Sequence, residues 1–332
     1  MQRAIKPQTI RQHYVPACYL ARFTLGGERD SPFFVRSLQG QVREDIPDHV
    51  GFERHYHTID VPGVSPDYLE DVFQNIEGPA CALFKTLSAN PGRPLLTELE
   101  VHAAMYFLVV QAARVPQSKR RYEDLIVDAG RSFMEQVTSS PEFFQRVTAS
   151  AQQQGIVTER VEQSWLREGV QSGGIKVAAD KTNVAIGMLR LASAVADQLE
   201  HMRWTLWYAD GPDSFVCSDY PVGLFFSVSA DNVLEDPTAI ETPKVRLLAN
   251  TIYMPLAHNV AIVVHGNEDV PLVQRANQRM VAIVNAITVS HAQRFICSRT
   301  QDFVCVLPGG RLGNAQEAVD ALVSLQRTEP AR

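Results

Sequence analysis

The feature that most constrains the fold is a run of residues at 101–115 that is apolar on every face of the helix it predicts. Thr97 followed by Glu100 is a capping-box pattern, which predicts the start of that helix. Pro116 predicts its end, because a proline disfavours helical geometry in the residue before it. The run includes Gln111 and Arg114 and is shorter than the roughly 18 apolar residues that suggest a membrane span. We therefore expect a helix buried in a globular core.

The remaining patterns alternate between helical and extended spacing. Helical spacing predicts helices at 66–87, 176–202, 273–290 and 315–325. Runs of β-branched and aromatic residues predict strands at 204–208, 215–217, 224–228, 252–254, 260–264, 295–297 and 303–306. A hairpin is expected around residues 33–42, and residues 211–213 are expected to form a hairpin turn between the first two strands of the later half.

These elements predict an α+β fold that is rich in helix. Its mainly antiparallel sheet is formed by the N-terminal hairpin and the C-terminal half of the chain. The whole chain, 1–332, is expected to form one composite domain. The polar, Gln-rich residues 119–174, interrupted by Pro141 and Gly155, are expected to be a helical insertion or subdomain.

Charge, cysteine content and the N-terminal residues argue against several classes of protein. The formal charge of −6 repels nucleic acid at long range unless a local basic patch overrides it, and the best patch is Arg114 with residues 119–121. That patch is either a solvated helix face or a phosphate site. Five scattered cysteines without a C-x-x-C pair predict neither a disulfide framework nor a zinc knuckle. The first 12 residues lack an apolar leader region, so a cytoplasmic, non-membrane protein is expected.

The segment Arg11-Gln12-His13-Tyr14-Val15-Pro16-Ala17-Cys18-Tyr19-Leu20-Ala21-Arg22-Phe23 resembles the signature H-Y-V-P-x-x-Y-L-x-x-F of a bacterial family, domain of unknown function 4238. The resemblance continues through Tyr68-Leu69-Glu70, Asn75-Ile76-Glu77, Gln111-Ala112-Ala113-Arg114-Val115-Pro116, Ser218-Asp219-Tyr220-Pro221-Val222, Pro255-Leu256 and Asn285. The chain departs from the family at Ala17, where glutamine is usual, and at Ala257-His258, where serine and proline are usual. The resemblance implies where a site lies without naming its chemistry.

Two carboxylates stand on the predicted helix at 66–87. Glu70, Gln74 and Glu77 are spaced by four and three residues, so they share one stripe at the margin of the apolar face. Carboxylates at the edge of a cleft bind divalent cations or act as acid and base. The alternative is an ordinary glutamate-rich helix border.

Gln111 and Arg114 lie on the apolar helix, where buried polar groups need partners. The partner of Arg114 is therefore an anion. The two alternatives are an ion pair with Glu70 or Glu77, and a ligand phosphate or carboxylate.

His13 and Asp219 complete the candidate set. His13 precedes Tyr14, Val15 and Pro16, whose restricted backbone would hold the imidazole for proton transfer, or else it is a structural histidine. Asp219 follows a predicted strand, which suits either a site or an Asx-type turn. His55 and His57 with Asp60 form a weak metal half-site pattern, and the usual nucleotide-binding and zinc-protease motifs are absent.

The first hypothesis is a nuclease-like hydrolase of phosphodiester or phosphate-ester bonds. His13, Glu70, Glu77 and Asp219 are its predicted catalytic residues, and Gln111, Arg114 and Asn285 its predicted substrate-binding residues. Glu70, Glu77 and Asp219 are also the predicted ligands of a divalent cation, Mg²⁺ or Mn²⁺. The predicted partner is a nucleotide or nucleic acid bound through the basic patch. The alternative is a non-catalytic sensor or interaction module in which the same residues form a buried structural network.

Overall fold

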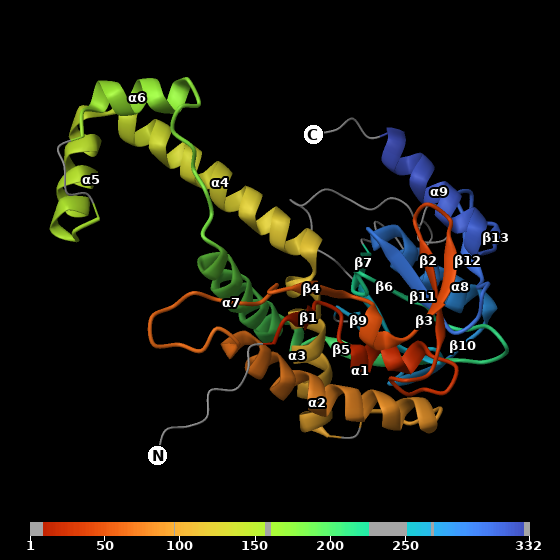
Figure 1. The fold of residues 1–332 in the computed structure, drawn as a ribbon. Coiled ribbons are helices and arrows are strands. Elements are labelled where there is room, and N and C mark those ends of the chain that lie inside the picture. Colours follow the sequence, from red (N-terminus) through yellow and green to blue (C-terminus); the bar gives the residue numbers. More distant parts are fainter. Residues whose placement is uncertain (1–8, 96, 157–160, 226–250, 267–268, 329–332) are drawn as a thin grey trace, which may run out of the picture. The chain divides into compact units, whose positions relative to one another are not determined.

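The computed structural model describes residues 9–95, 97–156, 161–225, 251–266 and 269–328 (Figure 1). The chain divides into two compact units: Met1–Val115 together with Leu189–Arg332, and Pro116–Met188. The fold class is α+β, and its strands pair almost entirely in antiparallel fashion. The segment expected to be a helical insertion, 119–174, lies within the second unit.

The first unit opens with a short ladder that fixes the signature segment. Strand β1 (Arg11–His13) pairs with β4 (Phe52–Arg54), and His13 stands opposite Phe52. The carbonyl of Gly51 then accepts hydrogen bonds from the backbone N–H groups of Tyr14 and Val15. Gly51 has a φ of 72°, and an added Cβ would come within 3.1 Å of Val15, so glycine is required there. Helix α1 (Ala17–Leu20) and the 3-10 turn η1 (Ala21–Phe23) follow directly.

The first unit contains two larger sheets, one built from the C-terminal half of the chain and one from both halves. The five-stranded sheet has the order β10 (Val273–Ala276), β5 (Arg203–Ala209), β9 (Val260–His265), β8 (Thr251–Ala257) and β7 (Gly223–Phe225). The four-stranded sheet has the order β3 (Val42–Asp45), β2 (Phe33–Ser37), β11 (Phe295–Ser298) and β6 (Cys217–Ser218). The N-terminal hairpin β2–β3 therefore pairs with the C-terminal half, as the sequence predicted. The 3-10 turn η2 (Pro47–His49) and the β12 (Cys305–Val306) and β13 (Leu312–Gly313) pair complete the extended structure.

Two predictions about the sheets were wrong. Residues 211–213 do not form a hairpin turn, because β5 pairs with β9 and β10 while β6 pairs with β11 in the other sheet. The predicted helix at 273–290 begins as strand β10, and helix α8 (Gln278–His291) starts only after Asn277. The side chain of Asn277 accepts a hydrogen bond from the backbone N–H of Met280, so it is an N-cap that apolar spacing alone does not reveal.

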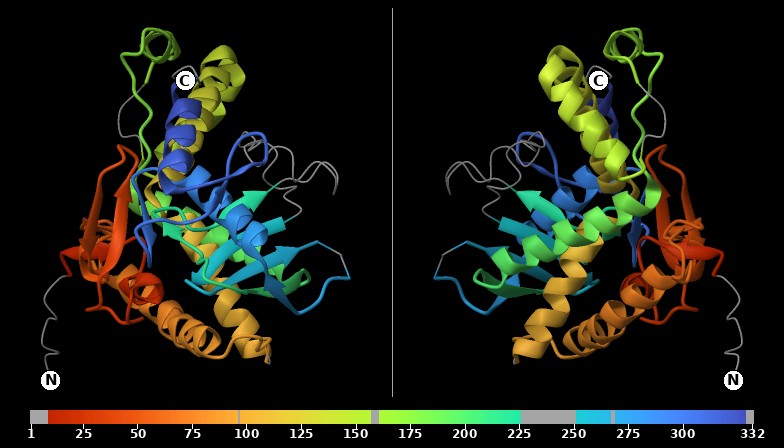
Figure 2. Two further views of the ribbon diagram at one scale, coloured as in Figure 1. Left: turned by 90° about the vertical axis from the view of Figure 1, so that its right-hand side faces the viewer. Right: turned by 90° about the vertical axis from the view of Figure 1, so that its left-hand side faces the viewer.

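Helices of the first unit cover these sheets. Helix α3 (Glu98–Arg114) is capped by Thr97, as predicted, and packs against α2 (Tyr68–Ala89). The rings of Tyr19, Phe84 and Phe107 meet with centroids 5.0–6.3 Å apart, which joins α1, α2 and α3 in one core. Helix α8 lies on the five-stranded sheet, and α9 (Ala315–Thr328) packs beside it (Figure 2).

The second unit consists of α4 (Pro116–Ser139), α5 (Pro141–Gln153), α6 (Gln163–Gln171) and the first part of α7 (Lys181–Leu199). Ser140 caps α5, and Arg167 of α6 donates hydrogen bonds to the carbonyl of Thr138. Few of its side chains are buried, and α6 has no buried residue. Within the described ranges, no helix is long and apolar enough to cross a membrane.

A disulfide joins Cys18 of α1 to Cys81 of α2, 63 residues apart in sequence, with their Cα atoms 6.0 Å apart. The sequence predicted no disulfide framework, and it did not reveal this single bond. Contact between α1 and α2 brings the two cysteines together, and an odd, scattered cysteine count cannot show such a contact. The other three cysteines, Cys217, Cys297 and Cys305, are buried thiols.

Candidate functional site

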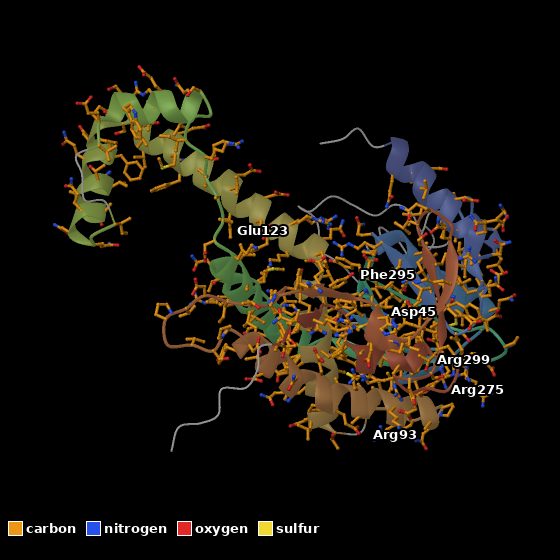
Figure 3. All side chains as sticks on the ribbon, in the orientation of Figure 1. Asp45, Arg93, Glu123, Arg275, Phe295 and Arg299 are labelled. Carbon is orange, nitrogen blue, oxygen red and sulfur yellow. A yellow bond between two sulfur atoms is a disulfide. The ribbon has the colours of Figure 1, made fainter. Side chains whose placement is uncertain are left out.

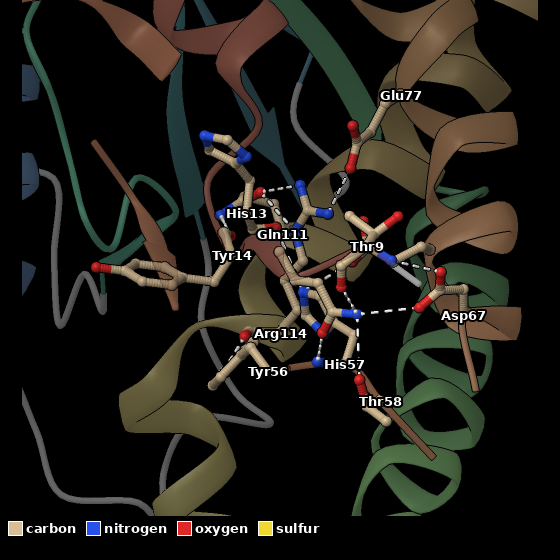
Figure 4. A network of polar contacts seen from close by, with 12 residues as sticks. Thr9, His13, Tyr14, Tyr56, His57, Thr58, Asp67, Glu77, Gln111 and Arg114 are labelled. Carbon is tan, nitrogen blue, oxygen red and sulfur yellow. Dashed lines mark hydrogen bonds and ion pairs between the residues drawn. The ribbon is translucent and has the colours of Figure 1, made fainter. Parts of the chain in front are cut away.

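Arg114 stands at the end of α3 and is the centre of a polar network (Figure 4). Its Nη1 atom lies 2.6 Å from Oε1 of Glu77, and its Nε and Nη2 atoms donate to Oε1 of Gln111 at 3.0 and 2.8 Å. The guanidinium also lies over the ring of Phe73, 5.2 Å from its centroid. Only 4% of the Arg114 side chain is exposed. The predicted ion pair with one of the two glutamates is therefore confirmed, and the partner is Glu77.

Backbone contacts tie this network to the signature segment. The Nε2 atom of Gln111 donates to the carbonyl of Tyr14 at 2.9 Å, and the hydroxyl of Tyr56 donates to the carbonyl of Arg114 at 2.9 Å (Figure 4). Gln111 is fully buried, so its contacts replace those it would make in water. The end of α3 and the chain around residue 14 are thus held together by side-chain hydrogen bonds.

Glu70 lies one turn before Phe73 on α2, and its side chain is 15% exposed. Its Oε1 atom is 4.0 Å from Nε2 of His57. The pKa of Glu70 is raised to about 7, chiefly by burial and also by the negative charge of Glu77, while Arg114 opposes the shift. Glu70 is therefore divided between its protonated and ionised forms near neutral pH, which is the property of a general acid or base.

His13 is held beside the same network. Its ring packs on Phe52, with centroids 5.6 Å apart, and its Nε2 atom is buried with no hydrogen-bond partner within the described part of the chain. The pKa of His13 is lowered to about 4, chiefly by burial; the nearby Asp48 carboxylate opposes the shift, and the Arg29 and Arg114 guanidinium groups contribute to it. The imidazole is therefore neutral at pH 7. The His13 carbonyl contacts Nε2 of His57 at 3.3 Å.

The sequence analysis did not identify Gln12 as a site residue, and it grouped His57 with His55 and Asp60 instead of with Glu70. Gln12 is fully buried, and its Oε1 atom accepts a hydrogen bond from the His57 backbone N–H at 2.5 Å. Its Nε2 atom donates to the Thr9 carbonyl and to Oγ1 of Thr58, both at 3.2 Å. The available signal was the position of Gln12 directly before the signature histidine. His57 faces Glu70 within the network, whereas His55 was expected to share a metal half-site with it.

Asp219 lies on another part of the first unit. Its Oδ1 atom accepts hydrogen bonds from the backbone N–H groups of Gln293 at 2.9 Å and Phe295 at 3.5 Å. Burial raises the pKa of Asp219, and these backbone donors oppose the shift. The pKa of Tyr14 is raised to about 12, chiefly by burial and also by the negative charge of Asp219. Asp219 organises the turn before β11.

Asn285 is a buried residue of α8 whose side chain links three backbone segments by hydrogen bonds. Its Oδ1 atom accepts from the Val216 backbone at 3.0 Å, and its Nδ2 atom donates to the carbonyls of Ser214 and Val304 at 3.0 and 2.9 Å. Asn285 is 0% exposed, so its side-chain polar atoms bond only to groups inside the protein. The structure thus brings together Glu70, Glu77, Gln111 and Arg114, and the His13 backbone carbonyl joins them through His57. Asp219 and Asn285 have backbone contacts of their own.

Among the described residues, no three or more His, Cys, Asp or Glu side chains are grouped so that they could hold a metal ion. Glu70, Glu77 and Asp219 therefore do not form the expected set of three carboxylate ligands. The basic patch also loses one predicted member, because the Arg114 side chain is buried in its ion pair.

The family model for a protein of unknown function, DUF4238, matches residues 11–302. The chain therefore belongs to this family, as the signature segment indicated. The matched range includes Gln12, His13, His57, Glu70, Glu77, Gln111 and Arg114. No curated protein and no solved structure is significantly similar to the chain.

Proposed function

We propose that the cluster of His13, His57, Glu70, Glu77, Gln111 and Arg114 is the catalytic site of a nuclease-like hydrolase. One observation carries this proposal: Glu70 is a partly exposed carboxyl group, beside a histidine, with its pKa raised to about 7. Perturbed carboxyl groups of this kind are concentrated at functional sites. The protein is proposed to act in the cytoplasm, although the Cys18–Cys81 disulfide is a feature more common in oxidising compartments.

The roles follow from the charges. As a water oxygen bonds to phosphorus, the bond between phosphorus and the leaving oxygen breaks, and protonated Glu70 donates its proton to that leaving oxygen. Neutral His13, whose Nε2 atom has no hydrogen-bond partner among the described residues, accepts the proton of the attacking water. Arg114 supplies the positive charge that favours a phosphate ester or phosphodiester, whose oxygens would take the place of the Glu77 carboxylate.

A divalent cation fits this proposal only if the substrate supplies some of its ligands. Glu70 and Glu77 offer two carboxylates, so phosphate oxygens and water would have to complete the coordination of Mg²⁺ or Mn²⁺. The assays below therefore include each metal and a chelator.

A specific observation favours the second candidate function, a non-catalytic binding module. The guanidinium of Arg114 is already bound by Glu77 and Gln111 and is almost wholly buried. A network closed in this way can exist to organise the fold, with ligand binding elsewhere on the surface.

The test uses Glu70→Gln, because it removes the titrating proton while leaving the Arg114–Glu77 ion pair in place. Wild type is assayed on phosphate monoesters, phosphodiesters, nucleotides and single-stranded and duplex nucleic acids, with Mg²⁺, Mn²⁺, Zn²⁺ or a chelator. We expect turnover that falls by at least about 100-fold in Glu70→Gln. The matched control is Asp71→Asn, which neutralises the exposed neighbouring carboxylate of the same helix and should retain activity.

Turnover in wild type should also decline as pH rises above about 7, where Glu70 loses its proton. An absence of turnover in every combination, or equal turnover in Glu70→Gln and wild type, would replace the hydrolase with the binding module.

A further inference from the structure

Away from the Arg114 network, Arg22 of η1 is a buried cation without a well-matched anion. It is 9% exposed, and its Nε atom is buried with no hydrogen-bond partner in the described ranges. The Oε2 atom of Glu28 lies 3.9 Å from its Nη2 atom, which is an ion-pair contact but too long for a hydrogen bond. Burial lowers the pKa of Arg22, and Glu28 opposes the shift. Burying a charge in this way is costly unless an anion binds it.

Glu28 is shared with a second cation. Its Oε1 atom is 2.7 Å from Nζ of Lys85 on α2, much closer than its other oxygen is to Arg22. The Glu28 side chain is 55% exposed, on the loop that follows η1. An exposed carboxylate of this kind can turn into solvent at little cost, because surface ion pairs contribute little to stability.

Arg299, which follows β11 and is labelled in Figure 3, brings a third cation to the same loop. Its Nη2 atom donates to the Leu25 carbonyl at 2.8 Å, and its Nη1 atom donates to Nε2 of His258 at 2.7 Å. His258 in turn donates its backbone N–H to the Arg22 carbonyl at 3.1 Å. Within the described part of the chain, Arg299 forms no ion pair with a carboxylate.

We propose that Arg22, Lys85 and Arg299 bind the phosphate group of a small soluble phosphate monoester, at a site separate from the Glu70 cluster. Arg22 and Lys85 share the single carboxylate of Glu28, and Arg299 pairs with no carboxylate among the described residues, so two of the three positive charges remain uncompensated. A phosphate monoester carries nearly two negative charges at pH 7. The donors of a guanidinium match phosphate oxygens in geometry. Glu28 occupies part of this site until the phosphate replaces it. The site shares no residue with the proposed hydrolase centre and stands if that proposal fails.

The test is direct binding, without any assay of turnover. Isothermal titration with inorganic phosphate and with glycerol 2-phosphate measures Kd for wild type, Glu28→Gln and Lys85→Met. Glu28→Gln removes the competing carboxylate and should tighten binding about fivefold, and Lys85→Met should weaken it about fivefold. The control is Arg43→Gln, which removes one positive charge from an exposed arginine paired with Asp45 and should leave Kd unchanged.

NMR of the arginine side chains gives a readout that needs no substitution of Arg22. The Nε–H resonance of Arg22 should shift in a saturable manner as phosphate is added. Equal affinity for both ligands would assign the site to the phosphate group alone, and tighter binding of glycerol 2-phosphate would assign it to the ester. Equal Kd values in wild type and all three variants, or no saturable binding even in Glu28→Gln, would overturn the proposal.

Discussion

Burial shifts the pKa values of Glu70 and His13 in opposite directions. Burial favours the neutral form of both, so the pKa of the carboxyl rises to about 7 and that of the imidazole falls to about 4. The two groups consequently have opposite effects on stability as pH changes. The stabilising contribution of Glu70 is complete below pH 4.5 and is lost as pH rises through about 7, whereas that of His13 is complete above pH 6.5 and is lost as pH falls through about 4.

Glu70→Gln isolates the first of these effects. The free energy of unfolding of wild type, measured relative to Glu70→Gln, should fall by about 1 to 2 kcal/mol between pH 4.5 and 7.5, after allowing for solvent screening of a partly exposed carboxyl. Urea denaturation at several pH values measures the difference. Parallel curves for the two proteins across this range would show that Glu70 has an ordinary pKa.

Arg114→Ala should destabilise the protein by about 3 to 5 kcal/mol, because it leaves Glu77 and Gln111 without their partner in a buried setting. The melting temperature and urea midpoint report the loss. The control Arg43→Gln removes an exposed arginine from its ion pair with Asp45 and should change the free energy of unfolding by less than about 1 kcal/mol. A wild-type melting temperature in Arg114→Ala would contradict the buried ion pair.

Helices α1 and α2 are joined both by packing and by the Cys18–Cys81 disulfide. Cys81 follows Glu77 by four residues, so it lies on the same stripe of α2 as Glu77 and Glu70. Cys18 follows His13 by five residues. The covalent link therefore holds together the two segments from which the candidate site is built.

Cys18→Ser should lower the free energy of unfolding by about 3 to 4 kcal/mol, because the disulfide closes a loop of 63 residues in the unfolded chain. Urea denaturation without reductant provides the measurement. In the presence of a reductant that opens the bond, wild type should lose most of its advantage over the variant. If wild type and Cys18→Ser unfold at the same urea concentration without reductant, the two cysteines are not joined in solution.

The two units of the molecule differ in how much apolar surface they bury. In α3 and α8, eight residues each are buried, whereas α4 buries three and α6 none. Local stability follows the density of buried contacts, so the unit Pro116–Met188 should open more readily than the first unit.

Hydrogen exchange followed by mass spectrometry tests this difference. Backbone amides of α4, α5 and α6 should exchange at least about ten times faster than those of α3, β8 and β9. Peptides from α9, a peripheral helix of the first unit, are the internal reference for the exchange expected of a helix at the edge of a unit. Equal protection of α4 and α3 would mean that the two units unfold together.

Local patterns in the sequence were enough to determine much of this protein. The capped apolar run fixed α3, helical spacing fixed most of α2, and the signature segment fixed the family. The need of the buried Arg114 guanidinium for an anion also followed, with Glu70, Glu77 and a ligand anion as the alternatives, and the structure identified Glu77. Only the tertiary structure decided which strands share a sheet, that Asn277 separates β10 from α8, and that Cys18 meets Cys81. It also decided that Asp219 and Asn285 face backbone groups, and that His57 faces Glu70. These outcomes depend on contacts between residues far apart in the chain, which local spacing does not encode.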